Sequence, residues 1–479
     1  VADISKVEIA GPGFINITLN RASQAVLVQT IVAAKSDYGK GIALAGVKVN
    51  LEFISANPTG PLHLGHTRWA AVGDALGRVL TAAGAQVTRE FYINDRGNQM
   101  DLFGQSVEAV ALGNAVPENG YQGEYIKDLA KDVVAEISGI KDLSGDERFV
   151  AFREAAYALQ LKDQQRVLET FNTHFDVWFS ERSLHDQGAV EHGMEKLRAQ
   201  GHVFDVDGAV WLRTTDFGDD KDRVMTKSDG SLTYFASDTA YYINKRERGF
   251  DICIYMLGAD HHGYIGRLKA TAACAGDNPE YNIHVLIGQL VKIMEGGEEV
   301  KLSKRAGTII TLEELVEKVG VDAARYTLIR YPVDTPMVMD IDVLKRNTNE
   351  TPVYYVQDAH ARIAAVLRNA EELGASLDLK DFDPAQLVHD RENELLGALA
   401  EFPRVVASAA EFREPHRIAR YLEELAGTYH GFYNDCRVLP MGEEKLTALH
   451  TARLLLCTAT KQVVKNGLEL LGVSAPERM

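Results

Sequence analysis

The segment from residue 47 to residue 93 constrains the fold more than any other part of the chain. Residues 47–53 (VKVNLEF) alternate apolar and polar side chains, which is the period of a half-exposed strand. A loop rich in proline and glycine follows, and residues 66–83 then repeat apolar side chains at helical spacing. Residues 87–93 predict a second strand. Because a strand, a crossover helix and another strand form a βαβ unit, we expect a parallel sheet.

The same pattern returns after a region of mixed character. Residues 100–230 are partly charged, and we expect them to form an insertion between the two halves of the sheet. Strands are then predicted at residues 252–257 and 283–293, with a helix after Gly263. Together these segments predict an α/β domain over residues 46–345.

The C-terminal part of the chain has a different character. From about Arg346 onward long helical patterns dominate, as in residues 354–373 and 416–433. We therefore expect an all-α domain over residues 346–479.

The composition excludes several classes of protein. The chain has 479 residues, of which 46% are hydrophobic and 25% charged, as is ordinary for a globular protein of roughly two to four domains. No run of about eighteen apolar residues occurs, so we expect no membrane span. The net charge of −17 argues against a surface coated with nucleic-acid-binding charge. Any polyanion must be held by local basic patches or by shape.

The cysteines and the first residues bear on the cellular compartment. Residues 1–4 show neither the basic nor the apolar stretch of a signal peptide, and they lack an initiating Met, which indicates a processed or shortened N-terminus. The cysteines form no C-x-x-C pair and no dense framework for disulfides, so a reduced, cytoplasmic compartment is the simplest interpretation. They are Cys253, Cys274, Cys436 and Cys457.

Residues 62–66 (LHLGH) stand where the first strand turns into the helix. A helix N-terminus presents unpaired N–H groups and a positive dipole to phosphates. Gly65 has no side chain, so a purine ring can lie against the backbone there. His63 and His66 can donate hydrogen bonds to phosphate oxygens. The alternative is that two histidines near a turn merely cap a helix, but the longer run over residues 58–66 (PTGPLHLGH) favours a nucleotide site.

A second, basic segment lies at residues 301–305 (KLSKR), before Gly307 and after the last predicted strand. Lys301 and Lys304 on such a loop can close over a triphosphate and neutralise departing pyrophosphate. Alone, a short basic run is most often a solvated surface. Its place in the order of segments favours the catalytic interpretation.

These two segments resemble the HIGH and KMSKS signatures of class I aminoacyl-tRNA synthetases. The resemblance implies a Rossmann-type catalytic domain followed by an all-α anticodon-binding domain. It implies that ATP, with Mg²⁺, is bound by Pro58, Thr59, Gly60, His63, Gly65, His66 and Lys304. It also implies a catalytic set of His63, Gly65, His66, Lys301 and Lys304.

Three further segments resemble arginyl-tRNA synthetase in particular: residues 55–58 (SANP), 175–181 (FDVWFSE) and 234–238 (YFASD). The resemblance implies that L-arginine is bound by Ser55, Asn57, Glu181, Tyr234, Asp238 and His261. Carboxylates are the groups that a planar guanidinium needs to face.

Each of these side chains also has an ordinary structural interpretation. Tyr234 and Asp238 are four residues apart and share one helix face. An acid beside an apolar, tyrosine-rich surface is costly to bury unpaired, and a bound guanidinium would remove that cost. Taken singly, however, Glu181 fits a surface acid, Asp238 an acid of a first helical turn, and Tyr234 a core residue.

Residues 257–264 (LGADHHGY) follow the predicted strand at 252–257. Asp260, His261 and His262 are residue types that could bind a metal ion. The resemblance instead implies a loop that lines the adenosine and amino-acid pocket, and we expect no metal bound by the protein.

Both ends of the chain resemble the tRNA-binding parts of the family. Residues 1–45 resemble the end of an N-terminal domain that contacts the tRNA elbow, and the helical segments resemble the anticodon-binding domain. The residues implied in contacts to tRNA(Arg) are Phe14, Asn16, Tyr354, Arg417 and Tyr433. Aromatic side chains can stack on splayed bases, although at helical spacing they are more often part of a core.

The implied reaction ligates L-arginine to tRNA(Arg) in two steps, through arginyl-adenylate, in a monomer. Catalysis then rests on positioning and on stabilising phosphate charge, without a protein nucleophile. A nucleotidylyltransferase would be shorter and would lack the helical domain. A non-catalytic RNA-binding paralogue would be expected to lose His63, His66 or Lys304, and a cysteinyl enzyme should show zinc-ligand cysteines.

Overall fold

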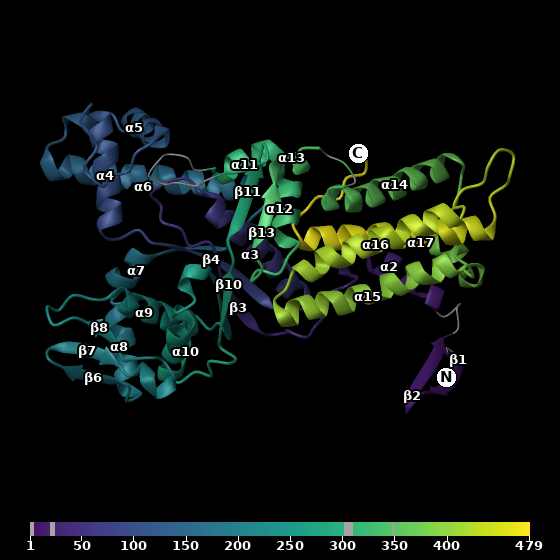
Figure 1. The fold of residues 1–479 in the computed structure, drawn as a ribbon, viewed down its shortest axis with the longest axis horizontal. Helices are drawn as coiled ribbons and strands as arrows, with labels where there is room; N and C mark the ends of the chain where they lie inside the picture. The colour runs from purple at the N-terminus through teal and green to yellow at the C-terminus, as the bar shows by residue number, and fades with distance from the viewer. Residues whose placement is uncertain (1–3, 20–23, 301–309, 347, 349) are drawn as a thin grey trace.

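The computed structural model describes residues 4–19, 24–300, 310–346, 348 and 350–479. Five parallel strands form its central sheet in the order β10-β9-β3-β4-β5 (Figure 1). They are β3 (Lys48–Glu52), β4 (Gln86–Ile93), β5 (Val177–Ser180), β9 (Ile252–Gly258) and β10 (Ile283–Gly288). The chain adds β4 and β5 on one side of β3 and β9 and β10 on the other. The predicted parallel sheet is confirmed, and its winding changes direction beside β3.

Helix α3 (Leu64–Ala82) is the predicted crossover from β3 to β4. It is buried over most of its surface, including Thr67, Arg68 and Asp74, because it packs on the sheet and also against C-terminal helices. One continuous hydrophobic core joins the two regions through this helix.

Two inserted units lie outside the central sheet. Helices α4 (Asn98–Ala111), α5 (Glu124–Glu136) and α6 (Gly145–Thr170) enclose a small core of their own. After β5, a second core is enclosed by α7 (Glu181–Asp186), α8 (Ala189–Ala199), β6 (Val203–Val206), β7 (Ala209–Leu212), β8 (Arg223–Thr226), α9 (Tyr234–Glu247) and α10 (Tyr264–Cys274). The single insertion expected over 100–230 is therefore interrupted, because β5 returns to the parallel sheet. A strand of four residues is too short to show a period.

The strand predicted over residues 283–293 is two strands. After β10 the chain leaves the parallel sheet, and β11 (Val291–Glu295) forms a second sheet with β12 (Glu298–Glu299) and β13 (Met337–Asp340). The indole of Trp69 occupies the space beside Gly288, where a Cβ would lie 2.4 Å from the ring. The guanidinium of Arg68 donates a hydrogen bond to the carbonyl oxygen of Gln289 at 3.0 Å. These contacts with α3 stabilise the break.

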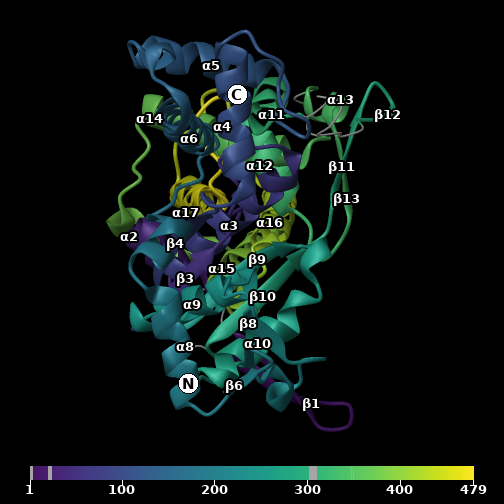
Figure 2. The same cartoon turned by 90° about the vertical axis from the view of Figure 1, so that its left-hand side faces the viewer.

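The C-terminal region is helical, as predicted, and its long helices lie side by side in Figures 1 and 2. Its elements are α11 (Leu312–Val319), α12 (Val321–Ile329), α13 (Ile341–Leu344), α14 (Pro352–Glu372), α15 (Asp390–Phe412), α16 (His416–Asp435) and α17 (Ala448–Leu470). The first residues form a hairpin of β1 (Ile4–Ala10) and β2 (Phe14–Leu19), followed by α2 (Leu27–Ala34), which packs on α17.

Arg325, on α12, joins the catalytic region to the helical one. Its side chain has no exposed surface, and its Nη2 lies 2.7 Å from the carboxylate of Asp74 on α3. The guanidinium also donates to the carbonyl oxygens of Phe171 and Leu471, at 2.9 and 3.0 Å. A Cβ at Gly472 would lie 2.3 Å from Arg325 Nη2, so this position requires glycine.

No helix within the described ranges is long and apolar enough to cross a membrane.

Candidate active site

The carboxyl ends of β3, β4, β5 and β9 meet at one edge of the central sheet, beside the point where the winding changes direction. In open α/β sheets, ligands bind in the crevice at this point. Several of the predicted site residues come soon after one of these strands in the sequence: Ser55 and Asn57 after β3, Glu181 after β5 and His261 after β9.

His63 and His66 are held by the N-terminus of α3. The Nδ1 of His63 accepts from the backbone N–H of Gly65 at 3.1 Å, and the Nδ1 of His66 accepts from the N–H of His63 at 3.2 Å. The ring centroids are 4.0 Å apart. Because each Nδ1 accepts, each neutral ring carries its proton on Nε2 and can donate there to a phosphate oxygen. The two histidines can therefore cap the helix and also contact a nucleotide.

Gly65 is required by the ring of His63. A Cβ at this position would lie 2.9 Å from His63 Cε1, closer than non-bonded carbons approach. The missing side chain thus makes room for the histidine itself.

The chain between β3 and α3 takes an unusual backbone path. Ile54 and Ser55 have φ angles of 69° and 47°, a region that non-glycine residues rarely enter. The hydroxyl of Ser55 donates to Glu52 Oε1 at 2.9 Å and accepts from the N–H of Tyr92 at 3.3 Å. These bonds fix the turn that leads to Asn57.

Two carboxylates near this turn have strongly perturbed acidity. Burial, together with the nearby charge of Asp238, raises the pKa of Glu181, the first residue of α7, to about 7, although the charge of Arg96 opposes the shift. Burial raises the pKa of Asp238 to about 6, and a hydrogen bond from the hydroxyl of Tyr264 at 2.6 Å opposes that shift. Within the described residues, no lysine or arginine forms an ion pair with either carboxylate, so the pair is suited to a cationic ligand.

Neighbouring acids, in contrast, are already neutralised. Glu52 pairs with Lys245 at 2.6 Å, and Glu90 pairs with Arg248 at 2.6 Å. Asp95 accepts from Ser180 Oγ at 2.6 Å and from two further donors. The charge left for a ligand is therefore concentrated at Glu181 and Asp238.

His261 lies close enough to Asp238 to lower its pKa, and its Nε2 is 3.5 Å from Asp260 Oδ2. In the part of the chain that the structure describes, no three His, Cys, Asp or Glu side chains are placed to hold a metal ion. Tyr234 begins α9 with 79% of its surface exposed, so it does not share the burial of Asp238.

Pro58 and Thr59 are buried and Gly60 is half-buried, next to the inserted helices. Lys301 and Lys304 lie outside the described residues. The chain just beyond that range pairs with the histidine segment, because the N–H of Leu64 donates to Ile310 O at 3.3 Å and that of Leu312 to Leu62 O at 2.9 Å.

The predicted RNA contacts are scattered over the chain. Phe14 is 70% exposed on the hairpin, and Asn16 is exposed as well. Tyr354 is half-buried against the core, whereas Tyr433 is 37% exposed. Arg417 is paired with Glu414 at 2.6 Å and lies over the ring of Phe412. The basic helix face is thus partly neutralised within the protein.

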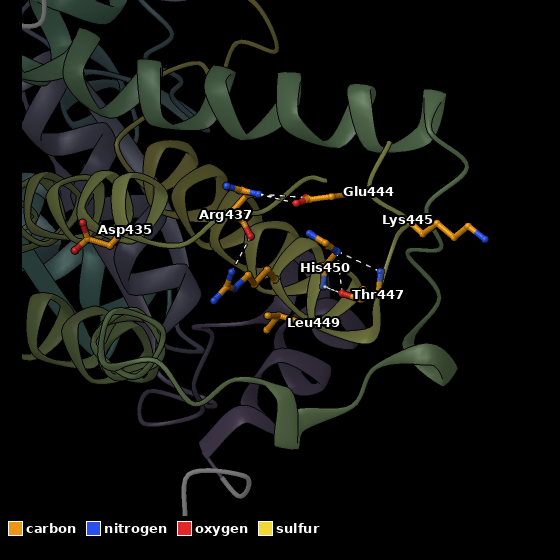
Figure 3. A pocket seen from close by; sticks show the side chains of 8 residues that line it. Asp435, Arg437, Glu444, Lys445, Thr447, Leu449 and His450 are labelled. Carbon is orange, nitrogen blue, oxygen red and sulfur yellow. Dashed lines mark hydrogen bonds and ion pairs between the residues drawn. The ribbon is translucent and has the colours of Figure 1, made fainter. Parts of the chain in front are cut away.

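A hollow of about 650 Å³ at the far end of the helical region was not predicted (Figure 3). It lies where α16 leads through a loop to α17, and its lining mixes basic, acidic and hydroxyl groups. The lining residues are Asp435, Arg437, Glu444, Lys445, Thr447, Leu449, His450 and Arg453. No pattern in the sequence indicated that the ends of these two helices border a hollow.

Comparison with known proteins agrees with this architecture. Residues 27–330 match the family described as tRNA synthetases class I (R), catalytic domain, and residues 356–479 match the DALR anticodon binding domain. The chain is 56% identical over 479 residues to the arginine–tRNA ligase of Paenarthrobacter aurescens and 56% identical over 476 residues to that of Frankia alni. It covers 86% of the length of each.

Solved structures are similar too. A putative arginyl-tRNA synthetase from Campylobacter jejuni superposes with a TM-score of 0.87 at 32% identity, with 96% of this chain and all of that chain covered. The Thermus thermophilus arginyl-tRNA synthetase shares the fold with a TM-score of 0.77 at 21% identity, with all of this chain and 89% of that chain covered. The chain belongs to the arginine–tRNA ligase family of class I aminoacyl-tRNA synthetases.

Proposed function

We propose that Glu181 and Asp238 bind the guanidinium of L-arginine in a site that ligates arginine to tRNA(Arg) at the expense of ATP. The observation that carries the proposal is this pair of neighbouring carboxylates, the buried Glu181 and the half-buried Asp238, neither of which forms an ion pair with a lysine or arginine among the described residues. A guanidinium offers five donors and a fixed positive charge, which would satisfy both acids at once. Ser55, Asn57 and His261 would orient the rest of the amino acid.

ATP would bind along residues 58–66. The Nε2–H groups of His63 and His66 would donate to its phosphates beside the positive end of α3. The carboxylate of arginine then attacks the α-phosphorus, forming arginyl-adenylate and releasing pyrophosphate. Lys301 and Lys304 would neutralise the leaving group, as their sequence indicates. A terminal hydroxyl of the tRNA next attacks the arginyl carbonyl, and AMP leaves.

The helical region would bind the tRNA anticodon arm. The hollow in Figure 3 offers Arg437, Lys445 and His450 beside Thr447, groups that suit phosphate and base contacts. Tyr433 and Arg417 lie on α16, whose end borders this hollow, and Tyr354 on the neighbouring α14. Phe14 and Asn16 would contact the tRNA elsewhere.

The proposal also covers the working form of the enzyme. It would act as a cytoplasmic monomer and take ATP as its Mg²⁺ complex, with the ion held by the phosphates. All four cysteines are buried and unbridged, which fits a reducing compartment. Light scattering at micromolar concentration tests the oligomeric state.

Pyrophosphate exchange, measured with each amino acid in the presence of tRNA(Arg), tests the central claim. Arginine should support exchange, and citrulline, which replaces the guanidinium by a neutral urea, should not. Asp238→Asn should raise the KM for arginine at least tenfold while changing that for ATP less than twofold. Glu195→Gln, at an exposed acid of α8, is the matched control. Equal effects on both substrates, or exchange with another amino acid, would contradict the assignment.

A further inference from the structure

The loop over residues 57–60 is held almost entirely by side chains of the inserted helices. The amide of Gln164, on α6, donates to the carbonyl oxygens of Asn57 and Gly60 at 3.2 and 2.8 Å. The hydroxyl of Tyr125, on α5, donates to Thr59 O at 3.2 Å.

Backbone pairing does not support this loop. Within the described residues, none of these three carbonyl oxygens accepts a hydrogen bond from another backbone N–H. A buried carbonyl needs a partner, so Gln164 and Tyr125 replace the bonds that a regular element would supply. The side-chain amide of Asn57 also bonds to Gln99 of α4, so all three inserted helices take part.

Gln164 stands at a rigid place on α6. Phe152 and Ala156, nearer the start of the helix, are buried in the core of the insertion, whereas Val167 and Leu168 belong to the main core. The helix is thus anchored on both sides of Gln164, whose surface is only 1% exposed. A side chain held in this way can fix a loop with little freedom.

The same helix also contacts the start of α11. Arg166, two residues after Gln164, forms a two-pronged pair with Glu313 of α11, at 2.7 and 3.0 Å. Thr311, two residues before Glu313, pairs with His63 across an antiparallel bridge. The start of α11 is therefore held by α6 on one side and by the histidine segment on the other. Because an exposed ion pair contributes little to stability, we attribute a positioning role to the pair between Arg166 and Glu313.

We propose that α6 couples the loop over residues 57–60 to the start of α11, with Gln164 as a positioning residue that fixes residues 57–60 and Arg166 as the link to α11. The inference rests on the proposed function of residues 58–66 as the ATP site. Gln164 does not touch the reacting atoms, and it acts through the loop carbonyls.

Arginine-dependent pyrophosphate exchange by Gln164→Leu tests the first half. This substitution keeps the approximate shape of the side chain and removes both bonds. We expect the KM for ATP to rise at least fivefold and kcat to fall at least tenfold, with a smaller change in the KM for arginine. Gln160→Leu is the matched control, because Gln160 is also buried, lies one turn earlier and makes none of these bonds. Equal behaviour of the two variants would overturn the role of Gln164.

Tyr125→Phe removes only the hydroxyl that bonds to Thr59 O and keeps the proposal testable if Gln164→Leu does not fold. It should raise the KM for ATP by about twofold to threefold. An unchanged KM would count against the proposal that these side chains fix residues 57–60. If the wild-type enzyme shows no arginine-dependent exchange, the proposed function itself fails, whatever these variants do.

Reversing the two charges of the ion pair tests the link between α6 and α11. Arg166→Glu should lower kcat for exchange at least threefold, and adding Glu313→Arg should restore most of that loss, because the reversed pair can form again. A double variant that is no better than Arg166→Glu would show that the ion pair between α6 and α11 has no part in catalysis.

Discussion

The ammonium of Lys245 lies 2.6 Å from Glu52 Oε2 beneath the candidate arginine site, where the lysine side chain has no exposed surface. The same ammonium lies over the rings of Tyr241 and Tyr255. Because Glu52 also accepts from Ser55, this ion pair supports the strained turn at residues 54 and 55.

Lys245→Met should destabilise the protein strongly. It leaves the charge of Glu52 buried without a partner, which costs about 3–5 kcal/mol in other proteins. Urea unfolding monitored by circular dichroism measures the loss. The double variant Lys245→Met, Glu52→Gln should recover a large part of it, and a double variant as unstable as the single one would show that the charge is not the cause.

Asp238→Asn should raise the stability of the ligand-free protein at pH 7–8. Burial raises the pKa of Asp238 from its ordinary value of 3.8 to about 6, so the folded state binds the proton more tightly than the unfolded state. The unfolded state loses this proton at about pH 4 and the folded state at about pH 6, and the protein loses stability over this range. Above about pH 6 the full cost of the ionised carboxylate lowers the free energy of unfolding. At about 1.4 kcal/mol per pKa unit, the gain is at most roughly 3 kcal/mol.

Melting temperatures measured with and without arginine show both the stability cost of the Asp238 charge and its contribution to arginine binding. The wild type should melt at a higher temperature when arginine is added, and Asp238→Asn should lose most of that increase. A variant that gains no stability and still responds to arginine would show that the buried charge is neither costly nor used.

The kcat/KM for arginine should fall as the pH is lowered through the pKa values of the acid pair. Glu181 titrates near pH 7 and Asp238 near pH 6, and only the ionised forms attract a guanidinium. We expect a decrease that begins below about pH 7 and steepens below about pH 6. Glu181→Gln should remove the upper step, although its overall activity is lower. A profile unchanged by Glu181→Gln would contradict the role of this carboxylate.

Gly65→Ala should lower kcat for pyrophosphate exchange about tenfold or more, because the new Cβ displaces the ring of His63. Stability should change little, since alanine favours a helix. Gly397→Ala is the control, as Gly397 lies within α15 with open space around its Cβ position. It should leave kcat unchanged and raise stability by about 0.5–1 kcal/mol. Full exchange activity in Gly65→Ala would show that the ring position is not critical.

Lys445→Glu should raise the KM for tRNA about threefold to tenfold without changing exchange kinetics for ATP, because under the proposed function it would replace a phosphate contact by repulsion. The effect should shrink as salt increases. Lys131→Glu makes the same charge change at an exposed site of the insertion. An equal rise in both variants would indicate a general loss of charge attraction.

The sequence alone was sufficient for the local elements of the fold. Residues 47–93 became β3, α3 and β4, because alternation and helical spacing are local properties. β5 was missed because four residues carry no period, and the break after Gly288 depends on Trp69, more than two hundred positions away. Contacts of that kind leave no local pattern.

The candidate site divides in the same way. His63, Gly65 and His66 form a contiguous motif that the sequence reveals directly. No local pattern distinguishes the acids that are paired with a cation from those that are not. Glu52 and Glu90 differ from Glu181 and Asp238 only in the cations that the fold brings to them. Helical spacing predicted that Tyr234 shares a helix face with Asp238, but the exposure of Tyr234 depends on how the start of α9 is covered.

The guanidinium of Arg325 makes the end of α17 part of the catalytic core. Cutting the chain after Leu470 would remove the Leu471 carbonyl that accepts two of its bonds, together with the glycine that leaves room for it. A catalytic fragment prepared without the helical region would carry an exposed face on α3 and an Arg325 that has lost its Leu471 acceptor. Attempts to express the two regions separately should therefore yield aggregation, and fusion partners are better attached elsewhere than near residue 470.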